Sequence, residues 1–116
     1  MFNPRRDPDY LADIHEALQR IASYIFGLSY DNFLADHKTQ DAVLRNLQVL
    51  GEAAKRVSAE TRRAHPAIPW KEMAGLRDKV VHDYFGIRYD VVWTVISQEL
   101  PVLLAAIEPL LNSPHS

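Results

Sequence analysis

The sequence predicts an all-α fold, an antiparallel bundle of four to five helices, from three observations. Apolar residues recur every three or four positions through four segments, which is the period of a helix buried on one face. No segment shows the strict alternation of apolar and polar residues that is typical of a strand. Prolines and glycines separate the four segments and indicate short connections between antiparallel neighbours.

The first helix is expected to open at Asp7 and Pro8, a cap followed by proline at the first helical position, and to close at Gly27. Its buried stripe consists of Leu11, Ile14, Leu18, Ile21 and Ile25. After a connection over residues 28–38, a long second helix is expected to pack against a neighbouring helix or a second copy of the chain. The apolar seam of this second helix contains Val43, Leu47, Leu50, Ala54 and Val57.

Two prolines, Pro66 and Pro69, predict a connection before the third helix, because the residue that precedes a proline avoids helical geometry. The third helix is expected to begin near Trp70 and to end at Gly86. The residues that it turns towards the core are Met73, Leu76 and Val80.

The fourth helix is expected to begin at a capping residue, Asp90, and to bury a long apolar stripe. Pro101 lies inside this helix and cannot bond to the carbonyl of Ser97, so a kink is expected there. The tail 112–116 is expected to fray. The buried stripe contains Val92, Ile96, Leu103, Ile107 and Leu110.

The composition indicates one globular domain that spans residues 1–116. A chain of 116 residues can bury a core without disulfides or metals, and no run reaches the roughly 18 uninterrupted apolar residues of a membrane-spanning helix. The absence of cysteine excludes a disulfide framework, a thiolate nucleophile and a Cys-ligated zinc. Since the first residues do not form a signal sequence either, a cytoplasmic location is expected, without a membrane partner.

The net charge of −2 argues against a protein whose whole surface binds nucleic acid. Many basic residues nevertheless come in pairs or near-pairs that folding could gather on one face. Each pair taken alone is better explained as solvated charge on a helix. These residues are Arg5, Arg6, Lys55, Arg56, Arg62, Arg63, Arg77, Lys79 and Arg88.

The segment RDKVVHDY, residues 77–84, holds the side chains best suited to catalysis. Arg77 supplies a permanent cation whose fork fits phosphate oxygens, and His82 can exchange a proton near neutral pH. On a continuous helix His82 would point about 140° away from Arg77, whereas Tyr84 would return to within about 20° of it. This geometry suggests a site built from two copies of the chain, the arginine of one near the histidine of the other. A helix end near His82 would also stabilise its protonated form.

Structural roles are an alternative for the same residues. A histidine and a tyrosine near a helix end commonly serve as capping or surface groups, and Asp78, one turn before His82, could simply pair with it. Tyr84 could be a core aromatic with its hydroxyl at the rim. The remaining histidines lack ligand spacing and no glycine-rich phosphate loop is present, so neither a metal site nor a cofactor is expected.

Three stretches together resemble the HepT-like toxins of the HEPN superfamily, which belong to bacterial and archaeal toxin–antitoxin pairs. The family motif is arginine, a polar residue, three further residues, histidine, any residue and tyrosine, and Arg77, Asp78, His82 and Tyr84 fill it. VLRNLQVLGEAAKRVS resembles the long second helix of the family, and DVVWTVISQELPVLLAAI resembles its last helix, including the proline.

The resemblance implies a metal-independent endoribonuclease that dimerises around the motif helix to form an RNA-binding cleft. Arg77 would bind the scissile phosphate, and His82 would act as general base or acid while the ribose 2′-hydroxyl attacks and leaves a cyclic phosphate. Asp78 would orient either residue. Tyr84 would accept AMP from a cognate MNT-type nucleotidyltransferase antitoxin, and the added negative charge beside Arg77 would block the cleft.

Glu52, Lys79 and Arg88 are weaker candidates for contacts with RNA or the partner. Glu52 lies among small residues of the long helix, where helix packing is the alternative role. Trp70 and Trp93 are expected to be core or interface anchors. A competing hypothesis is a non-catalytic helical module that docks the nucleotidyltransferase through the same polar residues, which agrees with the mildly acidic net charge.

Overall fold

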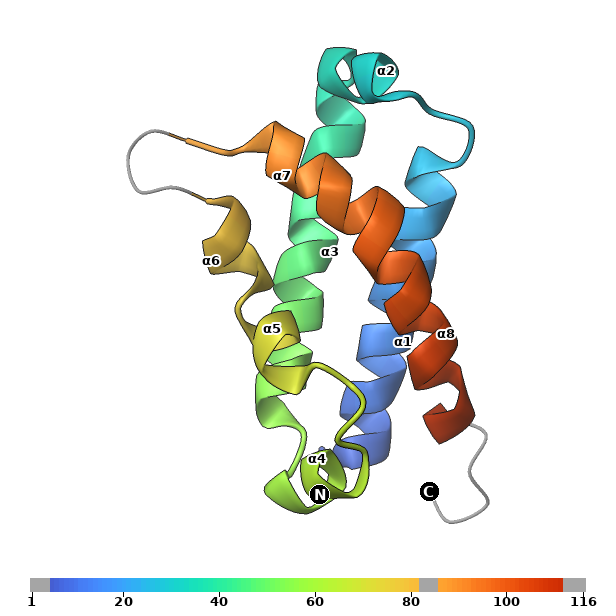
Figure 1. The fold of residues 1–116 in the computed structure, drawn as a ribbon, viewed down its shortest axis with the longest axis vertical. Helices are drawn as coiled ribbons and strands as arrows, with labels where there is room; N and C mark the ends of the chain where they lie inside the picture. The colour runs from blue at the N-terminus through green and yellow to red at the C-terminus, as the bar shows by residue number, and fades with distance from the viewer. Residues whose placement is uncertain (1–4, 82–85, 112–116) are drawn as a thin grey trace, which may run out of the picture.

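A computed structural model describes residues 5–81 and 86–111 (Figure 1). Over these ranges all regular elements are helical except for one isolated antiparallel bridge, between Val81 and Ile87, which confirms the all-α class. The tail 112–116 lies outside the described residues. The elements are α1 (Asp7–Ile25), α2 (Tyr30–Ala35), α3 (His37–Arg56), α4 (Ala59–Ala64), α5 (Trp70–Ala74), α6 (Leu76–Val80), α7 (Tyr89–Thr94), a π segment (Val95–Glu99) and α8 (Leu100–Leu111).

Helices α1 and α3 run antiparallel at the centre of the fold, and α8 packs along α1 (Figure 1). Helices α5 and α6 flank the other side of α3. The predicted apolar stripes form the core between these helices, because burying each large aliphatic side chain contributes roughly 1.5–3 kcal/mol. Only Ile25 and Leu110, at the ends of their stripes, are partly exposed. The stripe residues that are at most 2% exposed are Ile14, Leu18, Ile21, Val43, Leu47, Leu50, Ala54, Val57, Met73, Val80, Val92, Ile96 and Ile107.

Helix α2 lies where a plain connection was expected. Its first turn is capped by Ser29, whose Oγ accepts the Asn32 backbone N–H at 3.1 Å. Phe33 on this short helix is fully buried, and its ring packs against Tyr89 and Trp93 at centroid distances of 6.2 and 5.3 Å. The aromatic contacts explain why six residues suffice for a stable turn of helix here.

Asp7 is not the capping residue that the sequence suggested; α1 begins at Asp7 itself, with Arg6 as its cap. The Asp7 carboxylate instead accepts the Ser58 backbone N–H at 3.0 Å, the Ser58 hydroxyl at 2.6 Å and the Thr61 hydroxyl. Burial raises the pKa of Asp7, but the hydrogen bonds from Ser58 and Thr61 outweigh this effect and leave the pKa below its ordinary value. Asp7 thereby fastens the start of α1 to the start of α4.

The expected third helix is divided into α5 and α6 and is shorter than predicted. Gly75 separates the two helices, and α6 ends at Val80 rather than at Gly86. Val81 is extended and pairs with Ile87, and the Arg88 backbone N–H donates to the Val80 carbonyl at 2.9 Å. The helix therefore ends before His82, so the angles calculated for a continuous helix do not apply.

The last helix is continuous from Tyr89 to Leu111 but begins with Arg88 as its cap, so Asp90 lies inside the first turn. The irregularity expected at Pro101 takes the form of a π segment. In this segment the Leu100 backbone N–H reaches the Val95 carbonyl, five residues back. The wider turn accommodates the loss of the backbone hydrogen bond that proline cannot donate.

By length and composition the helix from Tyr89 to Leu111 would also be able to cross a membrane. In this fold, however, Val92, Ile96 and Ile107 pack into the common core. That burial along one face, against α1, is the behaviour of a core helix.

The hydrogen bonds to Asp7 predict a pH-dependent contribution to stability. Asp7→Ala is expected to lower the free energy of unfolding by about 1 kcal/mol at neutral pH, a value already discounted for solvent screening. Because the pKa is lowered in the folded state, this contribution is complete above the unfolded pKa of about 4 and is lost as the pH falls through the folded pKa.

Urea denaturation of both proteins between pH 7 and pH 2.5 measures this difference. Asp41→Ala, at an exposed position on α3, is the matched control and should show no such dependence. A difference that persists unchanged at the lowest pH would contradict the assigned role of the Asp7 carboxylate.

Candidate functional site

The side chain of Arg77 is presented to solvent by a short, firmly anchored helix. Leu76 and Val80, four residues apart on α6, are both buried. The three residues between them, Arg77, Asp78 and Lys79, are exposed. The sequence therefore placed Arg77 and Asp78 correctly on a helix, although that helix is only five residues long.

A polar hollow of about 170 Å³ lies where α6 faces α3. The Arg77 guanidinium lies 3.8 Å from the Asp78 carboxylate, and Lys55 lies 3.8 Å from Glu52. These separations are too long for hydrogen bonds, so neither cation donates to its acidic neighbour. The Arg77 side chain is 58% exposed and open to an anion. We call this hollow the Arg77 pocket; its lining includes Gln48, Gly51, Glu52, Lys55, Arg77 and Asp78.

Close contact between α3 and α5 sets the shape of this pocket. A Cβ atom at Gly51 would lie 3.3 Å from the Met73 carbonyl oxygen and 3.4 Å from that of Ala74. Only glycine allows the backbones to approach this closely without displacement, and the approach brings α6 against the exposed face of α3. Glu52 itself is 52% exposed, so helix packing is not its role.

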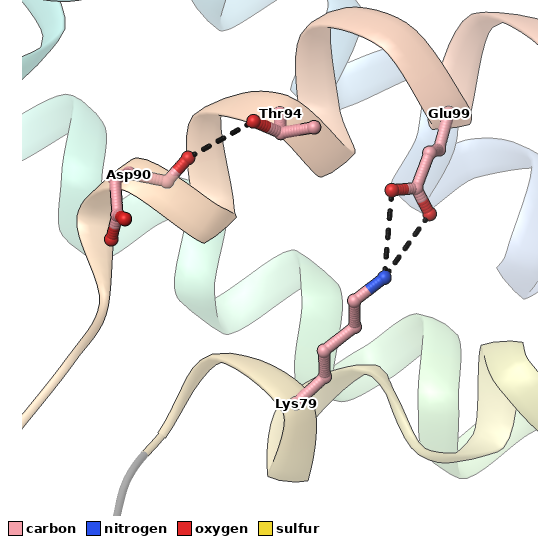
Figure 2. Close-up of polar contacts among 4 residues, drawn as sticks. All are labelled: Lys79, Asp90, Thr94 and Glu99. Carbon is pink, nitrogen blue, oxygen red and sulfur yellow. Dashed lines mark hydrogen bonds and ion pairs between the residues drawn. The ribbon is translucent and has the colours of Figure 1, made fainter.

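Lys79 and Arg88 lie outside the lining of the Arg77 pocket and have partners of their own. Figure 2 shows the Lys79 Nζ contacting both carboxylate oxygens of Glu99, at 3.4 Å each, and the Thr94 hydroxyl donating to the Asp90 carbonyl. Arg88 donates to the Asp90 carboxylate at 2.9 Å. The hydrogen bonds from Arg88 lower the pKa of the Asp90 carboxyl and raise the pKa of the Arg88 guanidinium. Lys79 therefore links α6 to the π segment, whereas Arg88 pairs with the first turn of the helix that it caps, α7.

The other two motif residues, His82 and Tyr84, lie outside the described residues. What the structure does describe is the pairing that flanks them. The Val81–Ile87 bridge and the hydrogen bond from Arg88 to Val80 hold positions 81 and 87 side by side, next to the end of α6. His82 follows Val81 directly in the chain, so it is joined to the element that carries Arg77.

Two other hollows in the described part of the chain differ from the Arg77 pocket in their lining. An apolar one of about 370 Å³ lies between α1 and the last helix, with Phe26 at its edge 89% exposed, but no titratable residue lines it. Another, of about 530 Å³, lies between α1 and α3, is lined mainly by charged and polar residues, and shares Gln48 and Glu52 with the Arg77 pocket. Sequence reasoning missed this hollow, because its residues come from α3, from α1 and from the segment before α1, which only folding brings together.

Potential metal ligands do not gather in the part of the chain that the structure describes: no three His, Asp or Glu side chains there are grouped as a metal ion would require. The groups available for chemistry around the Arg77 pocket are thus a guanidinium, an ammonium, two carboxylates and an amide. Within this set, the exposed guanidinium of Arg77 can bind a phosphate group.

Comparison with known proteins gives a consistent match over nearly the whole chain. Residues 14–110 match the family model described as ribonuclease HepT-like. A protein of Thermococcus cleftensis named as a probable ribonuclease HepT is 42% identical over 106 residues, which is 91% of this chain and 96% of the relative. A protein of Methanocaldococcus jannaschii named as a putative RNase is 39% identical over 110 residues, covering 94% and 91% of the two chains.

A third relative, from Caldanaerobacter subterraneus and also named as a putative RNase, is 36% identical over 103 residues, or 89% of this chain and 92% of its own length. No solved structure matches the chain.

The short distances at Gly51 predict that added bulk there will strain the contact with α5. Alanine in a helix interior normally gains up to about 1 kcal/mol over glycine, whereas overpacking costs about 1–3 kcal/mol. Gly51→Ala is therefore expected to lower the free energy of unfolding by about 1 kcal/mol. Chemical denaturation measures the change.

Gly75→Ala is the matched control, because a Cβ atom there would meet the nearest carbonyl at an ordinary 3.6 Å. This variant is expected to stay close to the parent protein. A stabilised Gly51→Ala protein would show that α5 can move away freely and that the glycine does not set the pocket.

Proposed function

The chain belongs to the HepT-like family, and we propose that it is an endoribonuclease toxin whose catalytic residues are Arg77 and His82. The observation that carries the proposal is the exposed Arg77 guanidinium in an open polar pocket, on a helix that leads directly to His82. The family match spans both positions. The names of the relatives as ribonucleases support RNA as the substrate.

The proposed reaction needs only a cation and a proton carrier. His82 accepts the proton of a ribose 2′-hydroxyl, and the 2′-oxygen attacks the adjacent phosphorus. The bond from phosphorus to the 5′-oxygen breaks, that oxygen takes up a proton, and the products are a 2′,3′-cyclic phosphate and a 5′-hydroxyl. Arg77 neutralises the charge that develops on the phosphate oxygens. Asp78, whose carboxylate lies 3.8 Å from the guanidinium, is proposed to orient either Arg77 or His82. No metal ion or cofactor takes part.

The catalytic centre is proposed to form between two copies of the chain. Arg77 and Asp78 are 58% and 85% exposed, which leaves the pocket open to water on its outer side. A second copy that covered α6 would exclude this water and strengthen the electrostatic stabilisation. It would also bring its own His82 to the Arg77 of the first copy, so that a dimer has two sites, each with the arginine of one chain and the histidine of the other.

Regulation is proposed to act on Tyr84. A cognate MNT-type nucleotidyltransferase antitoxin would transfer AMP from ATP to the tyrosine hydroxyl, with pyrophosphate as the leaving group. The transferred phosphate, on the chain segment that follows Arg77, would compete with RNA for the cation. The system would operate in the cytoplasm, where RNA and ATP are available.

A non-catalytic docking module is the second candidate, favoured by the net charge of −2. In that case the exposed residues of α6 would hold the nucleotidyltransferase, and RNA would not be cleaved at any ratio of the two proteins. If the protein binds the nucleotidyltransferase but does not cleave RNA, the docking function is supported and the nuclease is rejected.

A mixing experiment tests the composite centre. Arg77→Ala and His82→Ala proteins should each be inactive on labelled RNA in the presence of EDTA. After the chains exchange, half of the dimers contain one chain of each kind, and one of the two sites in such a dimer is intact. The mixture should therefore regain about a quarter of wild-type activity.

Lys71→Ala, which removes an exposed cation from α5, is the control and should stay fully active. Inactive mixtures of folded variants would indicate that one chain supplies both residues. Absence of cleavage by the wild-type protein, or equal cleavage by His82→Ala, would reject the proposed nuclease.

The proposed role of Tyr84 predicts a variant that is still toxic but can no longer be neutralised by the nucleotidyltransferase. Tyr84→Phe keeps the ring but removes the hydroxyl that would receive AMP. Cells that express this variant should still arrest growth and should no longer be rescued by co-expression of the nucleotidyltransferase. Intact-mass measurement should show a gain of one AMP only on the wild-type chain, and rescue of Tyr84→Phe would overturn the assignment.

A further inference from the structure

We propose that the hollow between α1 and α3 is a second RNA subsite, which binds the strand as it leaves the Arg77 pocket. It is lined by Tyr10 of α1, by Arg45 and Arg56 of α3 and by Arg5, which precedes α1, and it has a volume of about 530 Å³. The inference rests on the proposed function only in taking RNA as the ligand. It assigns a binding site and no catalytic role.

The two hollows adjoin each other at one turn of α3. Gln48 and Glu52 line both of them, and residues four apart on a helix lie one above the other on the same face. The Arg77 pocket opens on the α6 side of these two residues, and the second hollow opens on the α1 side. A strand that crosses α3 at Gln48 and Glu52 would therefore contact both hollows.

The second hollow offers the two kinds of contact that single-stranded nucleic acid uses. The Arg5 guanidinium lies over the Tyr10 ring, 5.1 Å from its centroid, and Tyr10 is partly exposed. Such a cation–aromatic pair is a platform on which a base can stack. Arg5 is held in place by a 2.6 Å hydrogen bond to Asp13.

The phosphate contact is provided by Arg45. Its side chain is exposed and has no hydrogen bond or ion pair to any residue that the structure describes, in contrast to Arg5. Arg56, which lies 3.8 Å from Glu52, is too distant to donate a hydrogen bond to it. Arg45 and Arg56 are 11 positions apart, about 16 Å along α3, so they can contact different phosphates of one strand.

Positive charge is concentrated along the Arg77 pocket and the hollow between α1 and α3. The two hollows are lined by five basic residues, Arg5, Arg45, Lys55, Arg56 and Arg77, and by only three acidic ones. Since the chain has 13 basic and 15 acidic residues, the remainder carries 8 and 12. A chain that is acidic overall thus presents a locally basic track, which would attract a polyanion to this face.

Binding of a single-stranded RNA of about ten nucleotides, with every 2′-hydroxyl methylated, tests the subsite without cleavage. Fluorescence anisotropy at several salt concentrations gives both affinity and salt dependence. Arg45→Ala should bind about fivefold more weakly, and its plot of log affinity against log salt should be shallower by about 0.7, the value of one lost phosphate contact. Tyr10→Leu, which keeps an apolar side chain but no stacking face, should bind about tenfold more weakly.

Arg63→Ala is the matched control, because it removes the same charge from an exposed position on α4 that lines neither hollow. Wild-type affinity in folded Arg45→Ala, or an equal loss in Arg63→Ala, would overturn the subsite. Cleavage assays of the same proteins on unmodified RNA separate the two proposals. If RNA binding depends on Arg45 but no RNA is cleaved, the subsite is retained and the nuclease is rejected. If RNA is cleaved but binding does not depend on Arg45, the nuclease is retained and the subsite is rejected.

Discussion

The packing of α3 against helices on both of its sides is the contact on which the rest of the structure depends. Val43, Leu47 and Leu50 are buried against the core. Gly51 lets the backbone of α5 approach on the same helix, and this approach brings Arg77 next to Glu52. The face of α3 that remains exposed joins the Arg77 pocket to the hollow beside α1. One helix thus holds the core together and forms the floor of the candidate site.

Regular periodicity made the larger elements predictable from the sequence. The stripes of α1, α3 and the last helix repeat over several turns, and burial of such a stripe determines a helix whatever its neighbours are. The short helices α2 and α4 have too few turns for this signal, although Ser29 and Ser58 cap them by side-chain hydrogen bonds. Asp7 was misread as a local cap because its partners, Ser58 and Thr61, are more than fifty residues away.

The candidate site was only partly predictable for a related reason. Arg77 and Asp78 could be assigned to an exposed helix surface from local spacing, whereas the end of that helix at Val80 depends on a pairing with residues 87 and 88. A helical pattern carries no information about this pairing. The hollow that contains Arg5, Tyr10 and Arg45 likewise results from the antiparallel arrangement of α1 and α3, which sequence spacing does not encode.

The ends of the RNA products test the central claim, that Arg77 and His82 cleave RNA by attack of the ribose 2′-hydroxyl. Mass spectrometry of a short RNA incubated with the wild-type protein in EDTA should show fragments that end in a 2′,3′-cyclic phosphate and begin with a 5′-hydroxyl. No such fragments should form with His82→Ala. Fragments with 3′-hydroxyl and 5′-phosphate ends, or the same cyclic products from both proteins, would contradict the account.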